Sequence, residues 1–344
     1  MIFFWFLLPI FLVLFYNKGR VKLSYFLSLI LFIILGFRDI TTGNNDGENY
    51  YSLFLLGEDY MTEHNVELFY VLINSFLIKY GLSFQWVLIV MSFISIACIF
   101  YAAHRSTRTE FKVIVFFVLL TYYFYNFNAM RQMTSISILI LSYTYLYDKR
   151  IRAFLILVIV ASLFHKSSLI ALLLLFFYKD KVQFSHPVAS LLLISSFIIG
   201  GFNLAAPLLG QLEVLFPEKY LARANEETIV GSSFSISKLL LTVFFIYIYG
   251  KIDKRDLYLK IALLGIVLFN FMSFSVVALR IAYPLTTAQI LLYSSTPFVK
   301  VKNDKQLNLI ILAYAVFLYY YMLVHNISGV LDYKFCGWGF IFGK

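Results

Sequence analysis

Residues 125–172 read YNFNAMRQMTSISILILSYTYLYDKRIRAFLILVIVASLFHKSSLIAL, and this stretch decides the fold. Two apolar runs, 132–147 and 153–164, flank the basic turn DKRIR, and the polar group HKSS follows the second run. Uninterrupted apolar runs of this kind are typical of helices that lie in a membrane. Similar runs recur along the whole sequence, so we predict one transmembrane domain over residues 1–344, without a soluble appendage.

The composition also indicates a membrane protein. Of the 344 residues, 61% are hydrophobic and only 13% are charged, whereas a soluble protein carries about 25% charged residues. Aromatic residues reach 19%, which suits lipid-facing surfaces and interfacial belts. The formal net charge is +10, but the basic residues sit in short clusters between apolar runs, as orientation signals do. We therefore expect no nucleic-acid partner.

We predict an all-α, polytopic integral membrane protein with about twelve transmembrane helices. The predicted spans are 2–16, 21–37, 84–103, 112–127, 132–147, 153–164, 168–178, 187–209, 236–250, 258–279, 281–293 and 307–324. Several are shorter than the ~20 residues that cross a bilayer core. The run Val66–Tyr80 is apolar as well, and we expect it to dip in from the outside or to lie on the surface.

The charge of the connecting segments supports that choice. When Val66–Tyr80 does not span, the inside segments hold 18 Lys/Arg and 6 Asp/Glu, and the outside ones hold 10 and 12. The net charge is then +12 inside and −2 outside, which follows the positive-inside tendency. Both termini are expected outside. The larger outward-facing segments, around 38–83 and 210–238, are expected to be loops, since the first is dense in Gly, Asn and Asp.

Four ionisable residues at span ends are functional candidates, because charge near the bilayer core is costly. They are Arg38, Arg131, His165 and Arg280. A single arginine at a span boundary is ordinarily a snorkelling anchor, but all four fall on the predicted outer side, which is poor in basic residues. Guanidinium groups hold phosphate oxygens in bidentate fashion. We therefore predict an anion site, in which an anion or the acidic outer segment neutralises these cations.

Further residues could complete such a site. His165 can bind a phosphate or act as a general base, and the sequence leaves both roles open. Tyr283 follows Arg280 by three residues and shares its helical face. An acceptor hydroxyl would need a base such as Asp46 or Glu48, although both can also be solvated loop residues.

Two residues next to Arg131 and His165 are further candidates, and several common sequence motifs are absent. Gln132 beside Arg131 is a candidate substrate contact, and Lys166 beside His165 is either a contact or an interfacial anchor. Cys98 and Cys336 share no motif, and the other histidines lack metal-ligand spacing. We expect no metal site and no cofactor. The phosphate-loop, GxGxxG, nucleophile-elbow and HExxH motifs are absent, so a nucleotide-driven pump is not expected.

Three stretches together resemble the EpsG-type branch of the Wzy-like bacterial polysaccharide polymerases. Residues 125–172 are similar to the family's aromatic/Asn-Arg-Gln opening, helix, basic turn and second helix ending in Phe-His-Lys-Ser. GFRDITTGNNDGENYYSLF at 36–54 resembles its GFR…G…D…Y segment, with Asp46 matched to the family's Asp. ALRIAYP at 278–284 resembles its later Arg–Tyr element. The spacing after Gly43 departs from the family's pattern.

The resemblance implies a multispanning, GT-C-like glycosyltransferase in the bacterial cytoplasmic (inner) membrane, with its active site facing the periplasm or exterior. The donor would be a glycan on undecaprenyl diphosphate, and the acceptor a second lipid-linked repeat unit of O-antigen, capsule or exopolysaccharide. Arg131 and Arg280, with Arg38 third, would neutralise the leaving diphosphate without a metal ion. Membrane lipid, a chain-length regulator and a flippase of the same pathway would be partners.

Two other functions stay open on the sequence alone. A lipid-linked oligosaccharide flippase or another transporter would also suit twelve spans and a cationic cavity, although the predicted inner halves of the spans carry almost no charge. A membrane acyltransferase built around His165 would need an acyl-donor pocket, for which the sequence offers no marker.

Overall fold

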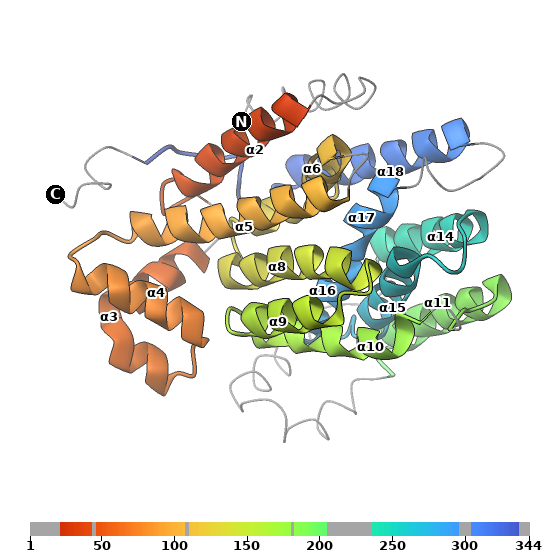
Figure 1. The fold of residues 1–344 in the computed structure, drawn as a ribbon, viewed down its shortest axis with the longest axis horizontal. Coiled ribbons are helices and arrows are strands. Elements are labelled where there is room, and N and C mark those ends of the chain that lie inside the picture. Colours follow the sequence, from red (N-terminus) through yellow and green to blue (C-terminus); the bar gives the residue numbers. More distant parts are fainter. Residues whose placement is uncertain are drawn as a thin grey trace. The chain divides into compact units, whose positions relative to one another are not determined.

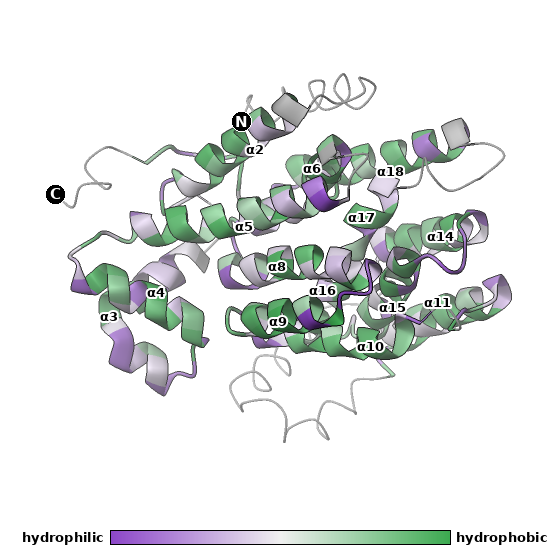
Figure 2. Cartoon of the chain, in the orientation of Figure 1, coloured by the Kyte–Doolittle hydropathy of each residue, from purple (hydrophilic) through white to green (hydrophobic). Residues whose placement is uncertain are grey.

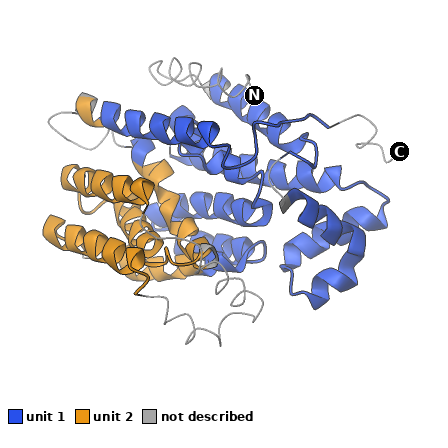
Figure 3. Cartoon of the chain, turned by 180° about the vertical axis from the view of Figure 1, so that it is seen from behind, with its two compact units in different colours: residues 1–169, 293–295, 308–344 blue, residues 170–292, 296–307 orange. Residues whose placement is uncertain are grey.

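The computed structural model describes residues 21–42, 46–106, 110–179, 182–204, 235–295 and 304–336, and its regular elements are helices (Figure 1). Extended pairing within these ranges is limited to one isolated antiparallel bridge, between Arg38 and Phe335. The predicted all-α class is confirmed. The chain divides into two compact units, residues 1–169, 293–295 and 308–344, and residues 170–292 and 296–307 (Figure 3).

Most helices of the first unit follow the predicted apolar runs, but the predicted span 112–127 is broken at Thr121, whose φ is +71°. The helices of this unit are α2 (Val21–Gly36), α3 (Asp46–Glu63), α4 (Leu68–Lys79), α5 (Gln85–Arg105), α6 (Glu110–Leu119), α7 (Tyr122–Tyr125), α8 (Met130–Tyr147), α9 (Ile151–Ser162) and most of α18 (Asp304–Val324). Helices α2, α5, α8 and α9 lie in a row in that order (Figure 1). Apolar residues cover most of their length, and polar residues gather in connections such as that between α8 and α9 (Figure 2).

Neighbouring contacts fix the direction of these helices. Helices α5 and α8 run parallel, because Ser95 in the middle of α5 bonds to Thr134 near the start of α8 at 3.1 Å, and Arg105 at the end of α5 bonds to Thr144 near the end of α8 at 3.1 Å. Helix α2 runs the opposite way, since the Gln85 side chain donates to the Gly36 carbonyl at 2.7 Å. The ends of α2 and α9 therefore lie with the starts of α5 and α8. We call this the Arg131 end of the first unit.

The segment 38–83 differs from the loop predicted there, because most of it is helical. The Gly- and Asn-rich stretch is short, and the apolar residues after it form α3 and α4. Gly57 takes a φ of +83° and kinks α3. At 1.5 Å per residue, the 12 residues of α4 extend only about 18 Å, too short to cross a core of about 30 Å. Helix α9, which is predicted to span, has the same length, so the prediction that Val66–Tyr80 does not span stays a prediction.

Membrane-crossing length is reached by two of the described helices. Residues 85–105 (α5) and 306–324 (within α18) are long and apolar enough to cross a membrane, and the other apolar helices are shorter. The count of twelve spans stays a prediction. The span 2–16 lies outside the described residues, and so does nearly all of the outward segment 210–238.

The second unit packs its helices around α15. Its elements are α10 (Leu174–Phe177), α11 (His186–Gly201), α14 (Ile236–Lys251), α15 (Leu257–Phe271), α16 (Val276–Thr286) and most of α17 (Ala288–Ser295), with the 3-10 helix η1 (Lys166–Leu173) leading into it from the first unit. Close approaches require glycine: a Cβ on Gly200 would lie 1.8 Å from the Asn270 carbonyl oxygen, and one on Gly265 would lie 2.5 Å from the backbone of Leu285.

The predicted span 258–279 is wrong at its end, because α15 stops at Phe271. A turn follows, and the Ser275 hydroxyl then accepts a hydrogen bond from the Ala278 backbone N–H at 3.5 Å. This N-cap satisfies one of the free amides at the start of α16. Arg280 consequently lies in the second turn of a new helix rather than between two spans.

Candidate active site

Arg131 occupies the first turn of α8 and forms an ion pair with Glu67. Its Nη1 lies 2.5 Å from Oε2 of Glu67, and the two side chains are only 21% and 11% exposed. The guanidinium carbon also lies 5.5 Å from the centres of both the Tyr50 and the Tyr70 rings. Arg131 is thus held by one carboxylate and two aromatic faces, contributed by α3, α4 and the residue before α4.

The sequence analysis did not identify Glu67. It precedes α4 in extended conformation, with φ −64° and ψ 140°, and its carbonyl accepts the Tyr70 and Val71 amides at 3.1 Å. The acidic outer segment was expected to neutralise the cations, and Glu67 belongs to that segment. An acid directly before the apolar run LFYVLINSFLI was the available signal, but the two partners are 64 residues apart in sequence.

Two polar atoms beside this pair are buried without a hydrogen-bond partner in the described part of the chain. They are Nε of Arg131 and the hydroxyl of Tyr70, a residue that is 0% exposed. One turn further along α4, Oδ1 of Asn74 is also unsatisfied, while its amide nitrogen donates to the Tyr70 carbonyl at 2.6 Å. Buried polar atoms normally have partners. Nε of Arg131 and the Tyr70 hydroxyl, which also interacts with the Asn74 side chain, can both donate to an anionic oxygen.

The HKSS turn lies at the same end of the first unit. The Phe69 amide at the start of α4 donates to the Leu163 carbonyl at 3.0 Å, and the Phe69 and Phe164 rings meet edge to face at 5.3 Å. On α8, Ser135 follows Arg131 by one turn, donates to the Ala161 carbonyl at 2.7 Å and hydrogen-bonds to Ser168. The structure therefore brings the start of α4, the first turns of α8 and the end of α9 together.

His165 is oriented by its own turn. Its Nδ1 lies 2.8 Å from the Ser167 hydroxyl, and the Ser167 amide donates to the same nitrogen at 3.4 Å. A nitrogen that accepts an N–H bond carries no proton, so the neutral ring places its proton on Nε2. This tautomer favours hydrogen-bond donation to an anion over proton abstraction. Lys166 beside it is exposed, and Gln132 is buried.

Arg38 is buried and binds backbone. Its guanidinium donates to the Leu35 carbonyl at 2.6 Å and to the Asn126 carbonyl at 3.3 Å, and it lies 5.1 Å from the Phe127 ring. Burial lowers the pKa of Arg38 to about 10, so the group stays charged at neutral pH. These contacts tie the end of α2 to the segment before α8, which is a positioning role. Tyr50 interacts electrostatically with both Arg38 and Arg131.

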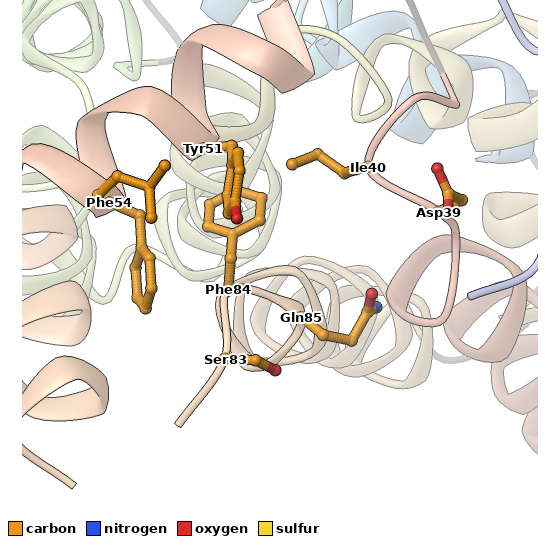
Figure 4. Close-up of a pocket in the computed structure, with 8 residues that line it drawn as sticks. Asp39, Ile40, Tyr51, Phe54, Ser83, Phe84 and Gln85 are labelled. Carbon is orange, nitrogen blue, oxygen red and sulfur yellow. The ribbon is translucent and has the colours of Figure 1, made fainter. Parts of the chain in front are cut away.

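A small pocket with a volume of ≈ 130 Å³ lies beside α3 (Figure 4). It is lined by Asp39, Ile40, Tyr51, Phe54, Leu55, Ser83, Phe84 and Gln85. Figure 4 shows Tyr51 against Phe84, with Ile40 facing them and Asp39 at the far side. The Asp39 carboxylate is held by Thr41, which donates both its amide, at 2.9 Å, and its hydroxyl, at 2.6 Å.

Glu48 and Asp46 are the two acids of the outer segment that the sequence predicts as candidate bases. Glu48 is exposed in the first turn of α3. Asp46 begins the same helix, and its side chain lies outside the described residues. Within the described ranges, no three His, Cys, Asp or Glu side chains come together as a metal site would require.

In the second unit, Arg280 and Tyr283 lie on α16, and both are partly buried. The Tyr283 ring is 5.9 Å from the Phe269 ring, and Nζ of Lys238 is 6.0 Å from the same ring. Lys238, in the first turn of α14, is a cation that the sequence analysis missed. Because Arg131 and His165 belong to the first unit, a site shared with Arg280 stays a prediction.

Comparison with known proteins gives a family assignment. No curated protein and no solved structure matches the chain. The model of the EpsG family matches residues 21–335, a range that includes Glu67, Arg131, the HKSS turn and Arg280. The match spans nearly the whole chain, and the chain therefore belongs to the EpsG family.

Proposed function

We propose that this protein joins oligosaccharide repeat units carried on undecaprenyl diphosphate, at the outer face of the bacterial cytoplasmic membrane. At the level of the family it is a membrane-bound, Wzy-like polysaccharide polymerase and hence a glycosyltransferase. The more specific proposal concerns the donor, a glycan whose leaving group is undecaprenyl diphosphate, and a second lipid-linked unit as acceptor. We propose a GT-C-like arrangement with the site open to the periplasm or exterior.

The observation that carries the proposal is the pair of donors at Arg131. Loss of a diphosphate develops negative charge, and preorganised donors that meet this charge supply most of such catalysis. The Arg131 guanidinium is fixed by Glu67 and two tyrosine rings, which leaves Nε and the neighbouring Tyr70 hydroxyl for a phosphate oxygen. His165 lies at the same end of the first unit and is a further proposed contact of the phosphate, and Arg280 and Tyr283 stay predicted contacts. Arg38 positions this end of the unit.

The opposite end of the first unit favours a polymerase over a flippase. There Arg105 pairs with Asp148 and lies 3.9 Å from the Tyr145 ring, so the charges of α5 and α8 satisfy one another. A transport pathway would need polar side chains that line its length. An acyltransferase has no comparable support, because His165 is arranged as a donor by Ser167.

Arg131→Lys tests the proposal. Lysine keeps a positive charge beside Glu67, so the protein should still fold, but it removes the planar fork and the Nε donor. With purified protein and a polyprenyl-diphosphate-linked repeat unit, we expect the wild type to release polyprenyl diphosphate and form a ladder of longer glycans. The variant should lose at least about tenfold in kcat/KM, on the scale of one charge-assisted hydrogen bond.

The control is Lys79→Arg, a conservative change at the exposed end of α4, which should not alter turnover. Wild-type kcat/KM in Arg131→Lys, together with wild-type chain length in Arg131→Ala, would reject the proposal.

A further inference from the structure

We propose that Glu67 is the general base that activates the acceptor hydroxyl. This inference rests on the proposed function, because it assigns a proton acceptor to that reaction. As the acceptor oxygen bonds to the anomeric carbon, the bond from that carbon to the diphosphate oxygen breaks and its electron pair leaves with the diphosphate. The hydroxyl proton must pass to a base at the same time.

Among the other candidate bases of the first unit, the Asp46 side chain lies outside the described residues, and the remaining ones are bound elsewhere or exposed. His165 accepts hydrogen bonds from Ser167 at Nδ1 and so carries its proton on Nε2. Asp39 holds its own turn through Thr41. Glu48 is exposed at the start of α3. Glu67 is a carboxylate that is 11% exposed and directly contacts the guanidinium proposed to meet the leaving group.

The ion pair couples base activation to the arrival of the donor. In the free protein, Arg131 Nη1 binds one carboxylate oxygen of Glu67. A diphosphate that binds the Nε edge of the guanidinium draws its positive charge away from Glu67, which weakens this bond and leaves the Glu67 oxygen able to accept a proton. The planar fork of arginine can face both groups, with the carboxylate at one edge and a phosphate oxygen at another. Base and leaving group are then held on one rigid side chain.

Tyr70 and Asn74 continue the face that begins at Glu67. Glu67 and Tyr70 both contact Arg131, and Tyr70 and Asn74 are buried, whereas Leu68, Leu72 and Phe76 are exposed. The Asn74 side chain interacts with the Tyr70 hydroxyl and so helps to hold it in place. The start of α4 thus places a hydroxyl beside the proposed base.

Glu67→Gln separates a base from a residue that only positions Arg131. Glutamine keeps a carbonyl oxygen that accepts from Nη1, so the position of Arg131 is retained while proton acceptance is lost. We expect kcat to fall by about 10²–10⁴-fold, the usual contribution of a general base, with no rise in the donor KM. Turnover is followed as release of polyprenyl diphosphate by the full-length protein in nanodiscs.

Two further variants guard against misfolding. Glu63→Gln makes the same change of charge at an exposed site in α3 and should leave kcat unchanged. Glu67→Asp keeps a carboxylate and should recover at least about tenfold over Glu67→Gln. Each variant is first checked for a monodisperse elution profile.

Several outcomes would overturn the assignment. A Glu67→Gln protein within about threefold of wild-type kcat, or one altered only in the donor KM, excludes a base at this position. Glu67→Asp no more active than Glu67→Gln, with both folded, also counts against proton transfer. If His165→Asn stops turnover while Glu67→Gln does not, the base is His165. A wild-type protein that releases no polyprenyl diphosphate instead refutes the proposed function.

Discussion

The ion pair between Glu67 and Arg131 predicts that substitutions of these two residues have strongly coupled effects on the free energy of unfolding. Removing one partner of a buried ion pair leaves an uncompensated charge and costs about 3–5 kcal/mol. Because the side chains retain 11% and 21% exposure, we expect the lower end, ~3 kcal/mol, for Glu67→Ala. Arg131→Ala should cost at least as much, since it also removes the contacts with the two tyrosine rings.

The double variant distinguishes pairing from independent effects. If the two side chains acted independently, Glu67→Ala/Arg131→Ala would lose ~6 kcal/mol, the sum of the single losses. Because the double variant leaves no unpaired charge, we expect it to lose no more than either single variant. Equilibrium denaturation in mixed micelles measures all four proteins of the cycle. A double loss equal to the sum would refute the pair, and it would also refute the view that Arg131 is held by Glu67.

Two other predictions concern positions away from the site. Gly265→Ala places a Cβ 2.5 Å from the backbone of α16, so α15 and α16 must separate. We expect the free energy of unfolding to fall by about 1–3 kcal/mol, seen as less folded protein on gel filtration. An unchanged yield of folded protein would contradict this packing. Arg105→Ala breaks an ion pair in which Asp148 is 46% exposed, so we expect the free energy of unfolding to fall by about 1 kcal/mol or less. Polymer length on a glycan gel should be normal. Loss of polymer would show that the far end of the unit belongs to the site.

Local sequence was sufficient for most helices and for part of the site. An apolar run in lipid has one low-energy conformation, the helix, which is why 84–103 and 132–147 match α5 and α8 closely. The charge of neighbouring loops predicts that Arg131 and His165 lie on the same side of the membrane, the outer one. Their placement at one end of the first unit agrees with that prediction, because α9 returns antiparallel to α8.

The remaining features depend on contacts that local patterns do not encode. The partner of Arg131 lies 64 residues earlier in sequence, and tertiary contacts, such as that of Phe69 with Leu163 and Phe164, bring it near. Helix α3 was not predicted, because Gly57 and several polar residues interrupt its pattern of apolar residues. The break after Phe271 was missed since Phe and Met continue the apolar run through the turn, and only the Ser275 cap marks the new start.

The most direct test of the anion site is a binding measurement. Titration of the nanodisc-embedded protein with a short-chain polyprenyl diphosphate, against the matching monophosphate, compares the wild type with Arg131→Lys. We predict that the wild type prefers the diphosphate and that the variant binds it at least about tenfold more weakly, which is about 1.4 kcal/mol. Equal affinity of both proteins for the diphosphate would show that the guanidinium at the start of α8 does not hold the leaving group.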